Sequence, residues 1–122
     1  MRIFKTKWFT RFAKKEGILD STLVKEAEKI ANGETGDNLG GYVYKLRISR
    51  SGAGKSGGYR VILFFRHYNR LFFYYAYPKS KRDNIEPDEL KELKRVAKRF
   101  MSDSDEQILV NIQAGELKEV RK

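Results

Sequence analysis

The pattern of hydrophobic and polar residues predicts three strands in the middle of the chain. From Tyr42 to Ser49 the side chains alternate, so that tyrosines and aliphatic residues face one way and Lys45 and Arg47 the other. Residues 60–65 and 71–77 are nearly continuous apolar and aromatic runs, which is typical of central strands. A turn at Asn69-Arg70 joins these two runs, so the three strands are expected to form an antiparallel meander.

Helical periodicity flanks the strands on both sides. A first helix is expected to begin after Thr6 with Trp8 and other aromatic residues on one face, and a second begins near Asp20. A third starts near Pro87, a residue that suits the first helical turn. Ser104 caps a short fourth helix, because Gln107 follows it at the spacing of a capping box.

These elements predict an α+β fold. With a short strand at residues 2–5 and a turn-rich linker over 33–41, the expected order is β-α-α-β-β-β-α-α, with the N-terminal helices packed on one face of a small antiparallel sheet. The length of 122 residues fits a single domain over 1–122, with a core of about 1–100 and a C-terminal helical extension over 102–122.

The net charge of +10 comes from one segment of the chain. No Asp or Glu occurs between Asn38 and Arg82, whereas ten basic residues do: Lys45, Arg47, Arg50, Lys55, Arg60, Arg66, Arg70, Lys79, Lys81 and Arg82. The rest of the chain holds sixteen basic and sixteen acidic residues and is neutral. Charge spread for solubility would not segregate in this way, so the segment predicts a surface that binds a polyanion.

Composition also narrows the chemistry. The chain has no cysteine and one histidine, His67, so no zinc site is expected and neither metal nor cofactor is assigned. No apolar run reaches the roughly 18 residues of a membrane span. The first residues lack the apolar segment of a secretory signal, so the protein is expected to be cytoplasmic and to have no membrane partner.

The segment 49–56 approaches the phosphate-binding pattern G-x-x-x-x-G-K-[ST], with Ser49 in place of the first glycine. Such a loop must lead into a helix, but a strand follows here. The segment is therefore interpreted as a Gly-rich loop that presents Arg50 and Lys55 to phosphates. Among the aromatic residues, Tyr59 and Tyr77 lie near strand ends beside basic residues and are candidates for stacking on nucleic-acid bases.

Three strings carry a resemblance to a known family: Tyr44-Lys45-Leu46-Arg47, Gly58-Tyr59-Arg60-Val61-Ile62 and Tyr77-Pro78-Lys79-Ser80-Lys81. Together with the order of elements, they resemble the RelE/ParE toxin superfamily over roughly residues 1–100 of this chain. The Gly-rich loop between the first two strings looks most like the HigB-like branch of RelE toxins. The resemblance implies a RelE-like fold.

The resemblance further implies the toxin of a type II toxin–antitoxin system. Such a toxin would be a metal-independent, ribosome-dependent endoribonuclease that cuts mRNA and so inhibits translation. Its partners would be mRNA on the ribosome and a cognate antitoxin with a helix-turn-helix DNA-binding part. Founding members carry further basic and aromatic residues after the position of Lys79. Ser80, Glu86 and Pro87 stand in that neighbourhood here, so Lys81, Arg82 or Tyr77 is expected to substitute.

The predicted catalytic residues are Lys45, Arg47, Arg60 and Lys79. RNA is cut when its own 2′-hydroxyl attacks the adjacent phosphate, which needs a base and positive charge on the phosphate. Neighbouring cations favour the neutral amine of a lysine, so Lys45 could be the base while the other three neutralise the phosphate. The expected RNA-binding set is Arg50, Lys55, Tyr59, Tyr77, Lys81 and Arg82. Arg70, at the far hairpin turn, is expected to be dispensable.

Two other functions fit parts of the sequence. One is a ParE-like toxin that inhibits gyrase by binding it, although the concentration of Lys and Arg over residues 45–60 argues against this. The other is an RNA-binding module without catalysis. A translation assay separates the gyrase inhibitor from the other readings, and mapping of mRNA 5′ ends separates cleavage from binding.

Overall fold

The computed structural model describes residues 1–49, 57–67, 69–82 and 84–121. It has the predicted α+β class, with helices and strands in the following order: β1 (Arg2–Thr6), α1 (Lys7–Glu16), α2 (Asp20–Ala31), β2 (Asp37–Gly40), β3 (Val43–Ile48), β4 (Tyr59–Arg66), β5 (Arg70–Pro78), α3 (Pro87–Ser102), α4 (Asp105–Gln113) and β6 (Leu117–Val120). No helix in these ranges is long and apolar enough to cross a membrane.

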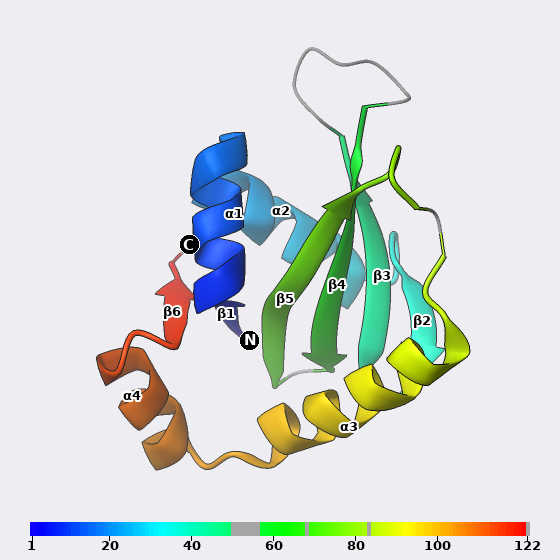
Figure 1. Cartoon of the computed structure of the whole chain (residues 1–122). Helices are drawn as coiled ribbons and strands as arrows, with labels where there is room; N and C mark the ends of the chain where they lie inside the picture. Colours follow the sequence, from blue (N-terminus) through cyan, green and yellow to red (C-terminus); the bar gives the residue numbers. More distant parts are fainter. Residues whose placement is uncertain (50–56, 68, 83, 122) are drawn as a thin grey trace.

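The strands form one mixed sheet in the order β2-β3-β4-β5-β1-β6 (Figure 1). The predicted meander is confirmed, because β3 pairs antiparallel with β4 and β4 with β5. The pairing of β1 with β5 is parallel, which the expectation of a purely antiparallel sheet missed. The sequence of β1 is too short to show its partner, and each of its paired residues lies 68 positions away on β5, as in Arg2 with Arg70.

Two strands lie where the sequence predicted none. The expected linker over 33–41 contains β2, and the expected helical extension over 102–122 contains α4 but ends in β6. Strand β6 pairs antiparallel with β1, with Ile3 opposite Val120. Both strands are only four residues long, so neither shows a clear period, and tertiary pairing rather than local propensity forms them.

Helices cover both faces of the sheet. Helices α1 and α2 bury one core with Leu63 and Phe73, and the ring centroids of Phe9 and Phe73 are 5.4 Å apart. Helices α3 and α4 bury a second core on the opposite face, where Phe100 packs edge-on against Phe64 and Phe72. The N-terminal helices thus lie on one face as predicted, and the C-terminal helices share the other face with the basic strand residues.

The helix ends follow the sequence signals. The Thr6 side chain accepts a hydrogen bond from the backbone N–H of Phe9 at the start of α1, and Ser104 does the same for Gln107 at the start of α4. Helix α1 ends at Gly17, whose φ of 72° is the left-handed conformation that glycine adopts without a steric penalty. Local sequence therefore fixes where these helices begin and end.

Arg70 is a structural residue, which corrects the expectation that it is dispensable. Arg70 is only 7% exposed. Its guanidinium donates hydrogen bonds to the backbone carbonyls of Phe100 and Asp103 and to the Asp105 carboxylate. These bonds hold the junction between α3 and α4 against the start of β5. The sequence placed Arg70 correctly at the hairpin but gave no sign of the helix junction that covers it.

Arg70→Ala is expected to lower the free energy of unfolding by about 1–3 kcal/mol, because the junction carbonyls lose their buried donor. Urea unfolding followed by circular dichroism measures this. Arg66, the Cα partner of Arg70 on β4, is exposed, and Arg66→Ala is the matched control, expected to change stability by at most about 0.5 kcal/mol. Equal stability of the two variants would contradict the structural role of Arg70.

Candidate nucleic-acid interface

The predicted catalytic residues come together at one end of the sheet. Arg47 on β3 and Arg60 on β4 are direct cross-strand partners. The backbone N–H of Lys79 donates to the carbonyl of Gly58 at 3.0 Å, which brings the residue after β5 beside the start of β4. In Figure 1 this is the upper end of the sheet, whereas α3 crosses the lower ends of β3, β4 and β5.

Pairing and strand alternation put the cations on the face that α3 covers. Lys45 lies two residues from Arg47 on β3, and its Cα partner is Ile62, a member of the core beneath α3 and α4. The site therefore begins where this second core ends. We refer to Lys45, Arg47, Arg60 and Lys79 together as the basic end.

Arg60 is half-buried, and its Nε is shielded from solvent. Among the residues that the structure describes, none accepts a hydrogen bond from this Nε. A buried guanidinium N–H without an acceptor is unfavourable, and an anion bound at the basic end would satisfy it. Arg60 is therefore the residue of the set whose surroundings favour an anionic ligand most directly.

Gly58 allows the strands to approach closely at this end. A Cβ atom at this position would lie 3.0 Å from the backbone carbonyl of Ile48 and 3.5 Å from Nε of Arg47. The tight contact is the one with the Ile48 carbonyl, whereas the distance to Arg47 is an ordinary van der Waals contact, so glycine serves the close approach of the backbone. This steric requirement explains why a glycine directly precedes Tyr59 and Arg60.

Arg82 and Tyr77 form a cation–π pair that α3 holds in place. The Arg82 guanidinium lies 4.4 Å from the centroid of the Tyr77 ring, and it donates two hydrogen bonds to Glu89 at 2.9 and 2.8 Å. These hydrogen bonds lower the pKa of Glu89, so the carboxylate stays ionised and opposes the positive charge of Arg82. Tyr77 is 5% exposed, so its ring is not open to a base in this arrangement.

The structure buries Tyr59 on the opposite face. Tyr59 is 3% exposed, its ring packs edge-on against Phe12 at 5.1 Å, and its hydroxyl donates to the carboxylate of Glu16. A ring in this position offers no surface on which a base could stack, so Tyr59 is assigned to the core beneath α1. The strand-end position suggested exposure, but α1 continues far enough to cover it.

Three predicted RNA-binding residues remain: Lys81, Arg50 and Lys55. Lys81 is exposed in the turn after β5, where its N–H donates to the carbonyl of Pro78. Arg50 and Lys55 lie outside the described residues.

His67 is exposed at the far end of β4 and packs against Phe65. Within the described ranges, no group of three or more His, Cys, Asp or Glu side chains is arranged to hold a metal ion.

Glu89 is the site residue that the sequence analysis missed. It lies near the start of α3, seven positions after Arg82, in a stretch where acidic residues are expected simply because they favour a helix N-terminus. Its charge opposite to Arg82 is the only sequence signal, and that signal is common on protein surfaces.

Comparison with known proteins identifies the family of this chain. The search of curated proteins found no match. A family model, described as the RelE toxin of the RelE / RelB toxin-antitoxin system, matches residues 1–120, and so includes every helix and strand described above. This match bears out the resemblance to the RelE toxin superfamily and extends it to β6. The chain therefore belongs to the RelE toxin family of type II toxin–antitoxin systems.

Proposed function

We propose that this protein is a ribosome-dependent mRNA endoribonuclease that inhibits translation in the cytoplasm, of the HigB-like branch of RelE toxins. The observation that carries the proposal is the pairing of Arg47 with Arg60, with Lys79 bonded through its backbone to the same end of the sheet. Like charges placed directly opposite across two strands destabilise a sheet. A phosphate bound between them would remove that repulsion.

The chemistry uses the RNA's own 2′-hydroxyl. Lys45 takes the 2′-proton, the 2′-oxygen forms a bond to the adjacent phosphorus, and the bond from phosphorus to the 5′-oxygen breaks. The products are a 2′,3′-cyclic phosphate and a 5′-hydroxyl, whose proton comes from Lys79 or water. Arg47 and Arg60 stabilise the extra negative charge on the phosphate oxygens as it develops.

The ribosome would supply the orientation that this open sheet end cannot provide. Arg47 and Arg60 lie near strand ends, Lys45 lies in the middle of β3, and Lys79 lies in the turn after β5. A large part of the activation free energy of this reaction comes from aligning the 2′-oxygen with the leaving 5′-oxygen. We therefore expect slow cleavage of free RNA and fast cleavage of mRNA held in the decoding site.

Arg60→Ala is expected to abolish growth inhibition, because several kcal/mol of transition-state stabilisation are lost when an arginine on the reacting phosphate is removed. Mapping of mRNA 5′ ends after expression should show new ends for the unaltered toxin and none for Arg60→Ala. Arg66→Ala, an exposed arginine at the other end of β4, is the control and should remain toxic.

Other outcomes distinguish the alternatives. Full toxicity of Arg60→Ala would place the site elsewhere. Translation block without new 5′ ends would indicate an RNA-binding module, and intact translation with inhibited gyrase would indicate a ParE-like toxin.

Glu89→Gln is expected to strengthen the binding of single-stranded RNA, because it frees Arg82 to contact a phosphate. One added contact should steepen the dependence of log affinity on log salt by about 0.7. Glu92→Gln is the matched control, since Glu92 lies one turn along α3, is exposed and pairs with Arg95. Titrations at several salt concentrations measure both slopes. Equal slopes would mean that Arg82 stays on Tyr77 and does not bind RNA.

We further propose that the antitoxin encoded with this toxin carries a helix-turn-helix DNA-binding part. Family membership supports an antitoxin partner, and the helix-turn-helix part rests on the resemblance to the HigB-like branch. Co-expression should give a stable complex that also binds its own promoter DNA, measured by co-purification and gel shift. A complex without DNA binding would contradict the helix-turn-helix part, and toxin that never co-purifies with the neighbouring product would contradict the pairing.

A further inference from the structure

A recess on the α3 face of the sheet belongs to none of the functions assigned above. It has a volume of about 670 Å³, within the range of small-ligand sites, and lies between the start of α1, the middle of β5, the end of α3, and α4. Its walls include the aromatic rings of Trp8, Tyr75 and Phe100, together with Lys7 and Arg99.

A β-bulge in β5 forms one wall of this recess. Phe73 pairs with Leu63 and Tyr75 pairs with Ile62, so Tyr74 is an extra residue between two residues of β4. Both tyrosines consequently pack on the α3 face: Tyr74 lies against Phe64 with ring centroids 4.6 Å apart, and Tyr75 lies against Trp8 at 4.5 Å. A regular strand would have turned one of them to the other face.

Trp8 is exposed and yet held by its neighbours. It is 44% exposed, although its ring stacks on Phe12 at 5.3 Å with an interplanar angle of 13° and contacts Tyr75. A large ring fixed in this way loses little freedom when a flat ligand stacks on it. The bases of single-stranded nucleic acids bind such rings without regard to sequence.

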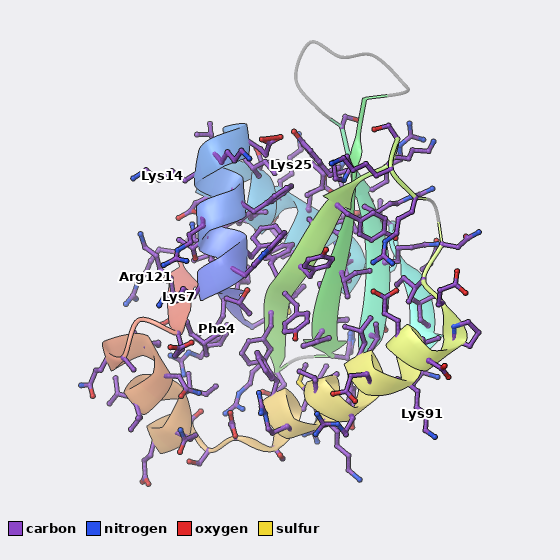
Figure 2. The ribbon with its side chains drawn as sticks, in the orientation of Figure 1. Phe4, Lys7, Lys14, Lys25, Lys91 and Arg121 are labelled. Atoms are coloured by element: carbon purple, nitrogen blue, oxygen red, sulfur yellow. The ribbon has the colours of Figure 1, made fainter. Side chains whose placement is uncertain are left out.

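The recess also carries the polar groups that a nucleotide requires. Lys7, at the start of α1 (Figure 2), and Arg99 can contact a phosphate. The carboxylates of Asp103 and Glu116 also line the recess, so the phosphate would have to lie on the side of the two cations. Gln107 and Asn111 of α4, whose side chains hydrogen-bond to each other at 3.2 Å, can offer donors and acceptors to a base edge. An aliphatic segment of a partner protein would leave these groups unpaired, so the lining favours a nucleotide.

Tyr75, which lines the recess, lies two residues along β5 from Tyr77. The ring centroids of Tyr75 and Tyr77 are 6.2 Å apart, and Tyr77 is the cross-strand partner of Arg60. Two residues of a strand span roughly 6.6 Å, so a chain bound at Arg60 could place its neighbouring nucleotide at Tyr75.

We propose that this recess binds one nucleotide of single-stranded RNA next to the phosphate held at the basic end, with its base stacked on Trp8. The assignment of that neighbouring phosphate rests on the proposed nuclease function, but binding in the recess can be measured without cleavage. The Trp8 recess would then influence which base the toxin accepts beside the cut.

Because Trp8 is the only tryptophan of the chain, its fluorescence reports on the recess directly. The full-length toxin is titrated with a single-stranded RNA oligonucleotide that carries 2′-O-methyl groups and cannot be cleaved. Saturable quenching is expected. Lys7→Ala should raise the Kd about fivefold, and Lys14→Ala is the matched control, since Lys14 is an exposed lysine on the same helix (Figure 2). Trp8→Ala, followed by anisotropy of labelled RNA, should weaken binding about tenfold.

Cleavage assays separate this proposal from the proposed function. Quenching without any cleavage of mRNA would support the recess and contradict the nuclease. The opposite result would be no quenching by RNA, together with mRNA cleavage at the same flanking bases in the unaltered toxin and in Trp8→Ala. That result would contradict binding in the recess and would leave the nuclease function supported. Quenching by the purified antitoxin but not by RNA would also overturn the proposal and make the recess a protein-docking site.

Discussion

The register between β3 and β4 is the constraint on which the candidate site depends. Val61, Leu63 and Phe65 of β4 point into the core beneath α1 and α2, so the alternation of the strand turns Arg60 to the other face. A slip of one residue would turn the arginine into the aromatic core beneath α1 and α2 and move the leucine to the α3 face. The apolar core therefore fixes the position of the arginine pair, and the repulsion between Arg47 and Arg60 is tolerated because the core opposes any slip.

Thr6 connects the recess beside Trp8 to the sheet. Its hydroxyl accepts from the N–H of Phe9 to begin α1 and donates to the carbonyl of Tyr74 in the bulge of β5. The start of α1 and the bulge are thus held together by one side chain. Since Trp8 and Tyr75 directly follow these two points, the local chain geometry that begins the helix also determines the wall of the recess.

The sequence predicted the features that depend on short periods and on order along the chain. The three-strand meander, the caps at Thr6 and Ser104, and the approach of Arg60 to Lys79 all follow from alternation, local hydrogen bonding and antiparallel pairing. What it could not predict depends on distant partners. Strand β6 forms because β1 presents an edge to it, Tyr59 is buried because α1 covers it, and Arg70 is buried because the junction of α3 and α4 folds over it.

These distant partners also distinguish among the basic residues of the segment between Asn38 and Arg82, which contains no Asp or Glu. In the sequence its ten cations look equivalent, but folding brings carboxylates from elsewhere onto particular ones: Asp105 reaches Arg70 and Glu89 reaches Arg82. Arg70 becomes a structural residue, and Arg82 is paired with Glu89. Arg60 differs because its buried Nε has no acceptor among the described residues. Charge density along the chain therefore predicts a polyanionic partner, whereas the distribution of acidic partners in space distinguishes the cations from which a phosphate site could be built.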